Sequence, residues 1–146
     1  MLKKGAKNVY AVDLNDELLH DTLKCDKRVI EVVKNAKLLD KNDFDCTLDL
    51  IVADLSFISA TMVMEVFSKL LDVGKNLILL IKPQFEVGGK RRFKNGIIRD
   101  KNLQNSACEK VISCAKEYGF SVLDLTTAPV VDGKNLEFLA LFVKLK

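Results

Sequence analysis

The sequence is poor in the residues that build metal and disulfide sites. Its 146 residues include no tryptophan, two prolines and one histidine, His20. The four cysteines, Cys25, Cys46, Cys108 and Cys114, form no Cys-x-x-Cys pair. Because a zinc site needs clustered sulfur and imidazole ligands, the sequence predicts no metal site. We expect free thiols and therefore a reducing, cytoplasmic compartment.

Long apolar runs are also absent. No stretch approaches the roughly 18 consecutive apolar residues of a membrane-spanning helix. Residues 1–5 have no apolar core of the length found in signal peptides. The sequence therefore predicts no partner in the membrane.

The overall composition is that of an ordinary folded domain. Hydrophobic residues make up 49% of the chain, enough for one domain with its own core over residues 1–146. The formal net charge is +3, from 23 Lys and Arg residues against 20 Asp and Glu residues. This weakly basic balance is compatible with RNA binding and equally typical of cytosolic enzymes.

Short apolar runs alternate with helical patterns along the chain. This alternation is typical of an α/β sandwich in which helices cover a mostly parallel sheet. The expected strands are 8–13, 29–33, 48–53, 76–81, 120–126 and 136–144, and the expected helices are 16–24, 60–71 and 101–118. Asp100 can cap the start of the last helix and Gly119 its end. The residues of helix 60–71 expected in the core are Met62, Val63, Val66, Phe67 and Leu70.

Lys82 stands where an apolar strand ends. The run 76–81 is continuous and apolar, as in strands covered on both faces, and Pro83 stops it. Ligands of open α/β sheets bind at the carboxyl ends of the strands, so Lys82 is a candidate functional residue. The alternative is a lysine that extends its ammonium into solvent.

Two carboxylates occupy comparable positions. Asp54 directly follows the apolar run 48–53, and Glu137 enters the apolar segment 136–144. Burial of an unpaired carboxylate is costly, so we expect Glu137 to have a partner.

Together these segments resemble one family, the TlyA-type or hemolysin A proteins of the FtsJ-like group of ribose 2'-O-methyltransferases. The resemblance extends over residues 5–146. It rests on Gly-Ala-Lys-Asn-Val-Tyr-Ala-Val-Asp at 5–13, Asp-Leu-Ser-Phe-Ile-Ser at 54–59, Ile-Lys-Pro-Gln-Phe-Glu-Val-Gly at 81–88, Asn-Gly-Ile-Ile-Arg-Asp at 95–100 and Asn-Leu-Glu-Phe-Leu at 135–139. The run at 81–88 is the most specific of them.

The resemblance implies methyl transfer from S-adenosylmethionine to a ribose 2'-hydroxyl of ribosomal RNA, by a Rossmann-like domain that carries a Lys-Asp-Lys-Glu tetrad. Three members of the tetrad match Asp54, Lys82 and Glu137. The first lysine lies upstream of the residues present. Ribosomal RNA or ribosomal subunits are the implied partners.

The chemistry expected of these residues is removal of a proton from a ribose hydroxyl. A hydroxyl is a poor nucleophile near neutral pH, so a base must face its proton while the methyl group is held in line. Lys82 is the candidate base. A lysine serves as a base when burial and a neighbouring cation lower its pKa, whereas nearby carboxylates raise it. Without the first lysine of the tetrad, we expect Asp54 and Glu137 to keep Lys82 protonated.

Asp13 and Asn35 are the candidate cofactor contacts, together with Asp54. In nucleotide-binding α/β folds an acid at the end of the second strand accepts ribose hydroxyls, and Asp13 closes the first strand present. Its alternative role is to cap the short helix that follows. Asn35 matches an asparagine that follows the next strand in the family, and its alternative role is that of a turn residue.

A glycine-rich turn between a strand and a helix is missing, although the chain has seven glycines. A doubly wound methyltransferase has such a turn after its first strand, where the backbone approaches the cofactor. We therefore expect a domain that is incomplete at its N-terminus and lacks that strand. Its loss would leave two unpaired edges. The strands ending at Asp13 and Ala53 should then pair with each other or with a second chain, either a homodimer partner or a complementing N-terminal fragment.

The densest basic run, Lys90-Arg91-Arg92-Phe93-Lys94, comes soon after the strand that ends at Lys82. Arg91, Arg92 and Lys94 are candidates for contacts with RNA phosphates, and Phe93 is a candidate for stacking on a base. The alternative is a solvated loop.

Three functions are open from the sequence. The first is 2'-O-methylation of ribosomal RNA. The second is a non-catalytic remnant of the same family that binds RNA or ribosomes, which a cofactor-binding measurement distinguishes from the first. The third is a membrane-active hemolysin, which requires a large exposed apolar face. The amphipathic helix at 101–118 has an apolar stripe of ordinary core-packing width, which disfavours the third.

Overall fold

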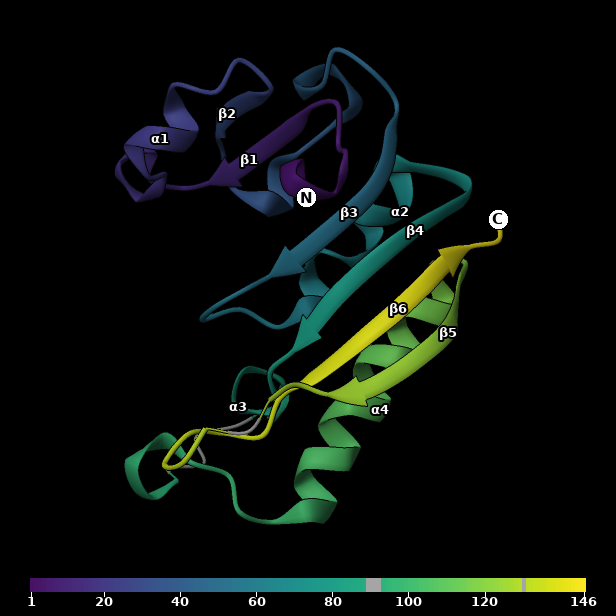
Figure 1. Cartoon of the computed structure of the whole chain (residues 1–146). Coiled ribbons are helices and arrows are strands. Elements are labelled where there is room, and N and C mark those ends of the chain that lie inside the picture. Colours follow the sequence, from purple (N-terminus) through teal and green to yellow (C-terminus); the bar gives the residue numbers. More distant parts are fainter. Residues whose placement is uncertain (89–92, 130) are drawn as a thin grey trace. The chain divides into compact units, whose positions relative to one another are not determined.

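The computed structural model describes residues 1–88, 93–129 and 131–146 (Figure 1). They form two compact units, Met1–Cys46 and Thr47–Lys146. Each unit has its own hydrogen-bonded sheet.

The N-terminal unit is built on a two-stranded parallel sheet. β1 (Val9–Asp13) pairs with β2 (Val29–Val33), with Val9 opposite Val29 and Asp13 opposite Val33. β-Branched and aromatic residues dominate both segments, as is usual in strands. The connecting helical segments are η1 (Leu2–Lys4), η2 (Asp16–Leu18), α1 (Asp21–Lys24), η3 (Ala36–Leu38) and η4 (Lys41–Asp43).

The C-terminal unit contains a four-stranded mixed sheet in the order β3-β4-β6-β5. Its strands are β3 (Leu48–Asp54), β4 (Leu71–Ile81), β5 (Phe120–Thr127) and β6 (Phe138–Lys144). β3 and β4 are parallel, whereas β6 is antiparallel to both of its neighbours. The helical segments are η5 (Ala60–Met62), α2 (Met64–Leu70), α3 (Pro83–Glu86), η6 (Lys94–Gly96) and α4 (Lys101–Glu117).

The core of the C-terminal unit lies between one face of this sheet and the helices α2 and α4, which cover the same face (Figure 1). Alternate residues of the central strands point into it. The fully or almost fully buried residues include Leu77, Leu79 and Ile81 of β4, Ala140 and Phe142 of β6, Phe67 of α2, and Val111 and Ala115 of α4. Burial of this apolar surface fixes the sheet against its helices.

The predicted ends of α4 are confirmed. The Asp100 side chain accepts hydrogen bonds from the backbone N–H groups of Asn102 at 2.8 Å and Leu103 at 3.3 Å. Gly119 follows the helix with a φ of 85°, and a Cβ at this position would lie 2.4 Å from a backbone oxygen of Lys146. Only glycine therefore fits at the helix end.

Two predicted helices differ from the structure. The segment 16–24 is not one helix, because the chain is extended at Leu19 and His20, and the His20 ring accepts from the backbone N–H of Thr22 to cap α1. The segment 60–71 starts as a 3₁₀ turn and becomes α-helical only at Met64. This change of winding turns Met62 outward, 54% exposed, while Met64 is fully buried. The prediction that Met62 lies in the core is therefore wrong.

Each unit pairs its own strands. In the N-terminal unit β1 is hydrogen-bonded to β2, and in the C-terminal unit β3 is hydrogen-bonded to β4. Within its own sheet, each of β1 and β3 therefore has one unpaired edge. That these two strands pair with each other or with a second chain stays a prediction.

Candidate functional site

The three residues matched to the tetrad lie at one end of the strands of the four-stranded sheet. Asp54 ends β3, where it is opposite Leu80 of the parallel strand β4. Lys82 follows Ile81, the last residue of β4, and Ile81 is opposite Phe138, the first residue of the antiparallel strand β6. Glu137 directly precedes Phe138. The strand register therefore brings Asp54, Lys82 and Glu137 together, each at the end of one of three adjacent strands.

Lys82 is paired rather than free in solvent. Its Nζ lies 2.5 Å from Oδ1 of Asp54 and donates a hydrogen bond to Oγ of Ser56 at 3.1 Å. The Lys82 side chain is 13% exposed, whereas that of Asp54 is 63% exposed. The ammonium is therefore held at the sheet edge beside a carboxylate that solvent and ligands can reach.

Glu137 is held by an amide of α3. The Nε2 group of Gln84 donates to Oε1 of Glu137 at 3.0 Å. The other polar atom of that amide, Oε1 of Gln84, is buried and has no hydrogen-bond partner among the described residues. The expectation that Glu137 has a partner is confirmed, and the partner is neutral.

Two further residues of α3 contact the loop that follows Asp54. The ring of Phe85 lies 5.4 Å from that of Phe57, centroid to centroid, at an interplanar angle of 50°. The carboxylate of Glu86 accepts from the Ala60 backbone N–H at 2.6 Å and from Oγ of Ser59 at 2.5 Å. The short helix α3 thus connects the strand end at Lys82 with the loop 55–59.

Phe57 adopts a backbone conformation that bulky residues rarely take. Its φ is 67°, in the left-handed region, and its side chain is 89% exposed. A large aromatic residue in this conformation costs roughly 1–3 kcal/mol and persists only where the surrounding structure enforces it. Such strain, beside the pair formed by Lys82 and Asp54, is typical of functional sites.

Asp13 is at the carboxyl end of β1, as the sequence predicts. Its Oδ1 accepts from the backbone N–H groups of Leu14 at 2.6 Å and Asn15 at 3.3 Å. The cap of the following turn η2 is Asn15, which accepts from the N–H of Glu17, so the alternative role of Asp13 as that cap is wrong. The Asp13 side chain is exposed, and Oδ2 takes part in neither bond, so its chemistry fits a contact with ribose hydroxyls.

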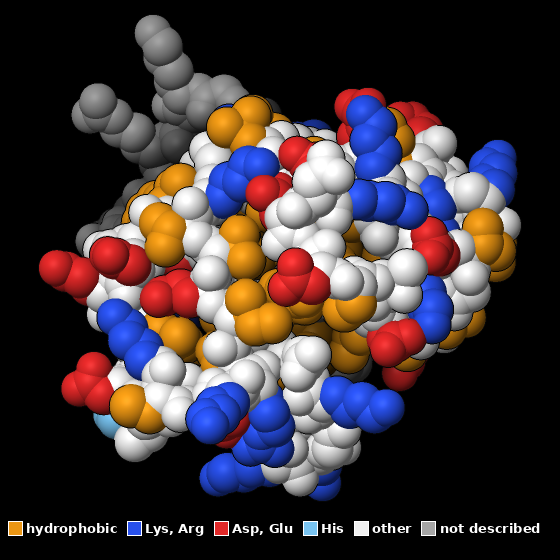
Figure 2. Space-filling model, turned by 90° about the horizontal axis from the view of Figure 1, so that it is seen from above, with side chains coloured by type: hydrophobic (Ala, Val, Ile, Leu, Met, Phe, Trp, Pro, Cys, Tyr) orange, Lys and Arg blue, Asp and Glu red, His pale blue; other side chains and the backbone are white. Residues whose placement is uncertain are grey.

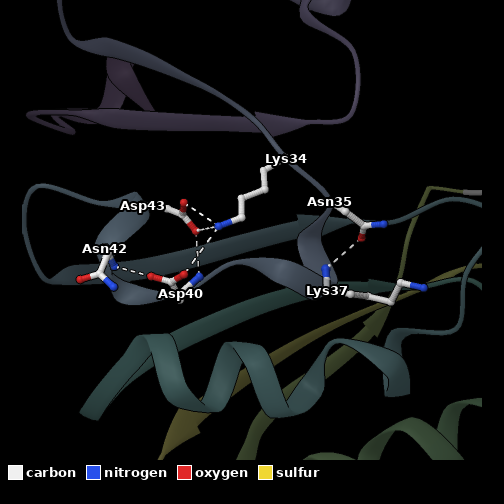
Figure 3. A network of polar contacts seen from close by, with 6 residues as sticks. All are labelled: Lys34, Asn35, Lys37, Asp40, Asn42 and Asp43. Atoms are coloured by element: carbon white, nitrogen blue, oxygen red, sulfur yellow. Dashed lines mark hydrogen bonds and ion pairs between the residues drawn. The ribbon is translucent and has the colours of Figure 1, made fainter.

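Asn35 acts as a turn residue, its alternative role. Its Oδ1 accepts from the N–H of Lys37 at 3.0 Å and caps η3 (Figure 3). The neighbouring Lys34 donates to both carboxylate oxygens of Asp43, at 2.8 and 2.7 Å. This hydrogen-bonded ion pair lowers the pKa of Asp43 and raises that of Lys34. The polar network therefore stabilises the loop on which Asn35 lies.

The basic run proposed for RNA contact is only partly described. Arg91 and Arg92 lie outside the described residues, and the side chain of Lys94 is not described either. On the face seen in Figure 2, positive and negative side chains are interspersed, with apolar side chains between them. Within residues 1–88, 93–129 and 131–146, no helix is both long and apolar enough to cross a membrane.

Four residues of the sheet edge are missing from the sequence predictions, namely Ser56, Phe57, Gln84 and Glu86. All of them lie inside the two segments 54–59 and 81–88 that carry the family resemblance. Membership of these motifs was the only signal that could have identified them. Polarity alone could not do so, because Glu86 is 3% exposed and carboxylates are rarely buried.

Known proteins resemble this chain over nearly its whole length. The FtsJ-like methyltransferase family matches residues 1–143. Hemolysin A of Brachyspira hyodysenteriae is 39% identical over 150 residues, which cover 98% of this chain and 61% of that protein. The 16S/23S rRNA (cytidine-2'-O)-methyltransferase TlyA of Mycobacterium tuberculosis is 31% identical over 131 residues, which cover 89% of this chain and 49% of that protein. The chain thus spans about half to three fifths of the length of these relatives.

Solved structures share the fold. A hemolysin from Streptococcus thermophilus superposes with a TM-score of 0.92 at 37% identity, covering 100% of this chain and 54% of that one. An S-adenosylmethionine dependent methyltransferase from Listeria monocytogenes superposes with a TM-score of 0.70 at 12% identity, covering 99% of this chain and 84% of that one. The α/β fold predicted from the sequence, of the Rossmann-like methyltransferase type, is confirmed.

Proposed function

Because the chain belongs to the FtsJ-like methyltransferase family, we propose that it is the methyltransferase part of an enzyme that methylates ribose 2'-hydroxyls of ribosomal RNA. One observation carries this proposal. Asp54, Lys82 and Glu137 lie on three adjacent strands at one sheet edge, with Lys82 paired to Asp54 and Glu137 held by Gln84. That edge is where ligands of α/β sheets bind.

Lys82 is the residue we assign to the ribose hydroxyl. Its Nζ is hydrogen-bonded to Asp54 and Ser56, so a neutral amine there would keep its lone pair for the proton of the 2'-hydroxyl. In methylation the 2'-oxygen would lose that proton and gain a bond to the methyl carbon, whose bond to the departing sulfur would break. Because we expect Lys82 to be protonated in this chain, it must lose a proton before it can act as the acceptor, and the Asp54 carboxylate next to it would stabilise the ammonium that results.

S-adenosylmethionine supplies the methyl group in this reaction when it is bound. Asp13 is the chain's candidate for the cofactor ribose, because its exposed carboxylate ends a parallel strand and Oδ2 is outside its local hydrogen bonds. Asp54 is the candidate cofactor contact in the C-terminal unit, and Asn35 is the third candidate cofactor contact. Asn35 would contribute through its amide nitrogen, since its Oδ1 caps η3.

The RNA is held, in this proposal, by cations and an aromatic ring. Arg91, Arg92 and Lys94 supply charge for phosphates, and the exposed ring of Phe57 offers a surface on which an unstacked base can lie. Recognition of single-stranded RNA uses such rings because every base has a π-face.

The remaining assignments follow from the same family membership. We assign residues 1–146 to one methyltransferase domain that acts in the cytoplasm on ribosomal RNA or ribosomal subunits. Within its own sheet each of β1 and β3 has one unpaired edge, which supports a strand donor, either a second copy of the chain or a complementing N-terminal fragment.

Transfer of tritiated methyl groups from S-adenosylmethionine to ribosomal RNA and to isolated subunits tests the proposal. Replacement of Lys82, Asp54 or Glu137 by alanine should reduce transfer by about 100-fold or more, the usual worth of acid–base groups. Lys75→Ala is the matched control, because Lys75 forms the same kind of ion pair, with Asp49 at 2.5 Å, on the same two strands. It should transfer at the wild-type rate. Loss of activity in Lys75→Ala equal to that in Lys82→Ala would contradict a catalytic role for Lys82.

Calorimetric titration with S-adenosylmethionine distinguishes the enzyme from a non-catalytic remnant. The enzyme should bind the cofactor, and Asp13→Ala and Asp54→Ala should weaken binding. A folded chain that binds ribosomal RNA but neither binds the cofactor nor transfers a methyl group would be the remnant.

A further inference from the structure

Glu86 has no part in the proposed chemistry, and yet it is the most deeply buried carboxylate of the described residues, 3% exposed. Its Oε1 accepts from the backbone N–H of Ala60 at 2.6 Å and its Oε2 from the hydroxyl of Ser59 at 2.5 Å. A buried carboxylate is costly unless its oxygens are hydrogen-bonded. Here Ser59, the last residue of the loop 55–59, and Ala60, the first residue of η5, each satisfy one oxygen.

The contacts of Glu86 fix the point at which that loop ends. Ala60 begins η5, and its N–H is one of the backbone donors at a helix start that lack an intrahelical partner. Ser59 caps the next donor, the N–H of Thr61, at 3.2 Å. Glu86 therefore completes the capping of η5 from a different segment of the chain.

Glu86 is itself fixed on its other side. Its carbonyl oxygen accepts from Nζ of Lys110 in α4 at 3.0 Å. The backbone of α3 starts at Lys82, whose carbonyl oxygen accepts from the N–H of Phe85 at 2.9 Å. The side chain thus links the loop after β3 to the helix that directly follows the candidate catalytic lysine.

The loop 55–59 is consequently held at both ends. Lys82 binds Ser56 at one end and Glu86 binds Ser59 at the other. Between them lies Phe57 with its strained φ of 67°. Strain of this kind persists only where the neighbouring structure enforces it, and the anchored residues Ser56 and Ser59 lie on the two sides of Phe57.

We propose that Glu86 is a positioning residue, which holds the loop 55–59 in the conformation that places Ser56 on Lys82, beside the strand end at Asp54. This role rests on the proposed methyl transfer at Lys82. Glutamine can replace the carboxylate, because its oxygen accepts from Ala60 while its amide group donates to Ser59, whose hydroxyl can turn to the Thr61 hydroxyl 2.7 Å away. Alanine can make neither contact.

The test compares Glu86→Ala, Glu86→Gln and the control Glu109→Ala, which removes an exposed carboxylate from α4. In the transfer assay, Glu86→Ala should lower kcat by about 10- to 100-fold, the cost of a misplaced catalytic group, with KM for S-adenosylmethionine unchanged. Glu86→Gln should recover most of that loss, and the control should keep the wild-type kcat. A wild-type kcat in Glu86→Ala, or equal losses in Glu86→Ala and Glu86→Gln, would overturn the proposal.

Amide hydrogen exchange tests the anchoring of the loop 55–59 by Glu86 independently of activity. In Glu86→Ala the amide of Ala60 should lose protection and residues 55–59 should exchange faster, while β4 and β6 keep their protection. If the wild-type chain transfers no methyl group, the proposed function fails and exchange alone tests the anchoring by Glu86. Unchanged exchange at Ala60 in a folded Glu86→Ala variant would overturn that anchoring.

Discussion

The side-chain amide of Gln84 donates to Oε1 of Glu137 at 3.0 Å, while its own carbonyl oxygen is buried without a partner among the described residues. The contact orients the carboxylate at the start of β6. A buried acceptor without a donor costs about 1–3 kcal/mol. We therefore expect function and stability to be opposed at this one residue.

Gln84→Leu should separate the two effects. Transfer should fall by about tenfold, since a misplaced group costs between that and 100-fold. The free energy of unfolding should stay the same or rise, because the buried orphan oxygen is removed. Gln104→Leu is the matched control. Its amide donates to the Ile98 carbonyl at 2.7 Å, so its loss should lower the free energy of unfolding by about 1–3 kcal/mol. Equal destabilisation in both variants, measured by urea unfolding, would contradict this account.

Function and stability should also be opposed at Phe57, here because its backbone conformation is strained. Asparagine tolerates the left-handed region better than phenylalanine, so Phe57→Asn should leave the free energy of unfolding unchanged or raise it by up to about 1 kcal/mol. It should also weaken RNA binding by about 5- to 100-fold, the worth of one stacked base. Titration with ribosomal RNA fragments measures this. Val73→Asn, which removes another exposed apolar side chain, should bind RNA as the wild type does. RNA affinity that is equal in the wild type and Phe57→Asn would exclude stacking on Phe57.

The absence of tryptophan makes Phe57→Trp a direct reporter of the same event. The variant contains one tryptophan, so its tryptophan fluorescence comes from residue 57 alone. Addition of RNA should quench that emission when a base stacks on the ring. A binding isotherm with no change in emission would indicate that RNA binds elsewhere.

The ion pair of Lys34 and Asp43 should make the N-terminal unit sensitive to acid. Asp43 has a lowered pKa in the folded state, so its stabilisation is present above the unfolded value of about 3.9 and is lost as the pH falls through the folded value. Asp43→Asn should remove this dependence and lower stability at neutral pH. Acid unfolding followed by NMR of residues 9–46 measures it, with Asp45→Asn as the control. A variant with the wild-type acid transition would contradict the prediction.

Lys144 should produce the opposite pH trend. Its Nζ contacts Ser68 and donates to the Tyr118 carbonyl at 2.9 Å, and burial lowers its pKa. The unfolded chain then holds this proton to a higher pH than the folded chain, so stability should rise with pH from the lowered value up to the ordinary 10.5.

Lys144→Met should remove the contribution of Lys144 to that rise. The free energy of unfolding of the wild type should therefore increase relative to that of the variant as the pH rises towards 10.5. At pH 7 the variant should be at least as stable as the wild type, because the Ser68 hydroxyl still donates to the Tyr118 carbonyl at 2.8 Å. Urea unfolding across the alkaline range is the measurement. A variant much less stable at pH 7 would show that the buried ammonium stabilises the fold.

Local sequence patterns predicted the elements whose causes are local. β2 has the bounds expected from its β-branched run, and α4 lies between the capping residues Asp100 and Gly119. Met62 was misassigned because periodicity assumes one continuous winding, while the chain changes from 3₁₀ to α at Met64.

The site was only partly predictable, for a different reason. Asp54, Lys82 and Glu137 follow from motifs and strand ends, but their approach depends on the register of β3, β4 and β6, which no single segment encodes. Phe57, Gln84 and Glu86 could not be assigned because their roles arise from contacts between distant segments.

The segment 82–86 also carries an evolutionary consequence. Four of its residues each contact a different partner, namely Asp54 for Lys82, Glu137 for Gln84, Phe57 for Phe85 and Ser59 for Glu86. A substitution of Gln84 alters the pair with Glu137 directly, whereas one of Glu86 also affects the loop 55–59 that carries Phe57. Across related sequences, a change at position 84 should therefore accompany one at position 137 rather than one at position 54.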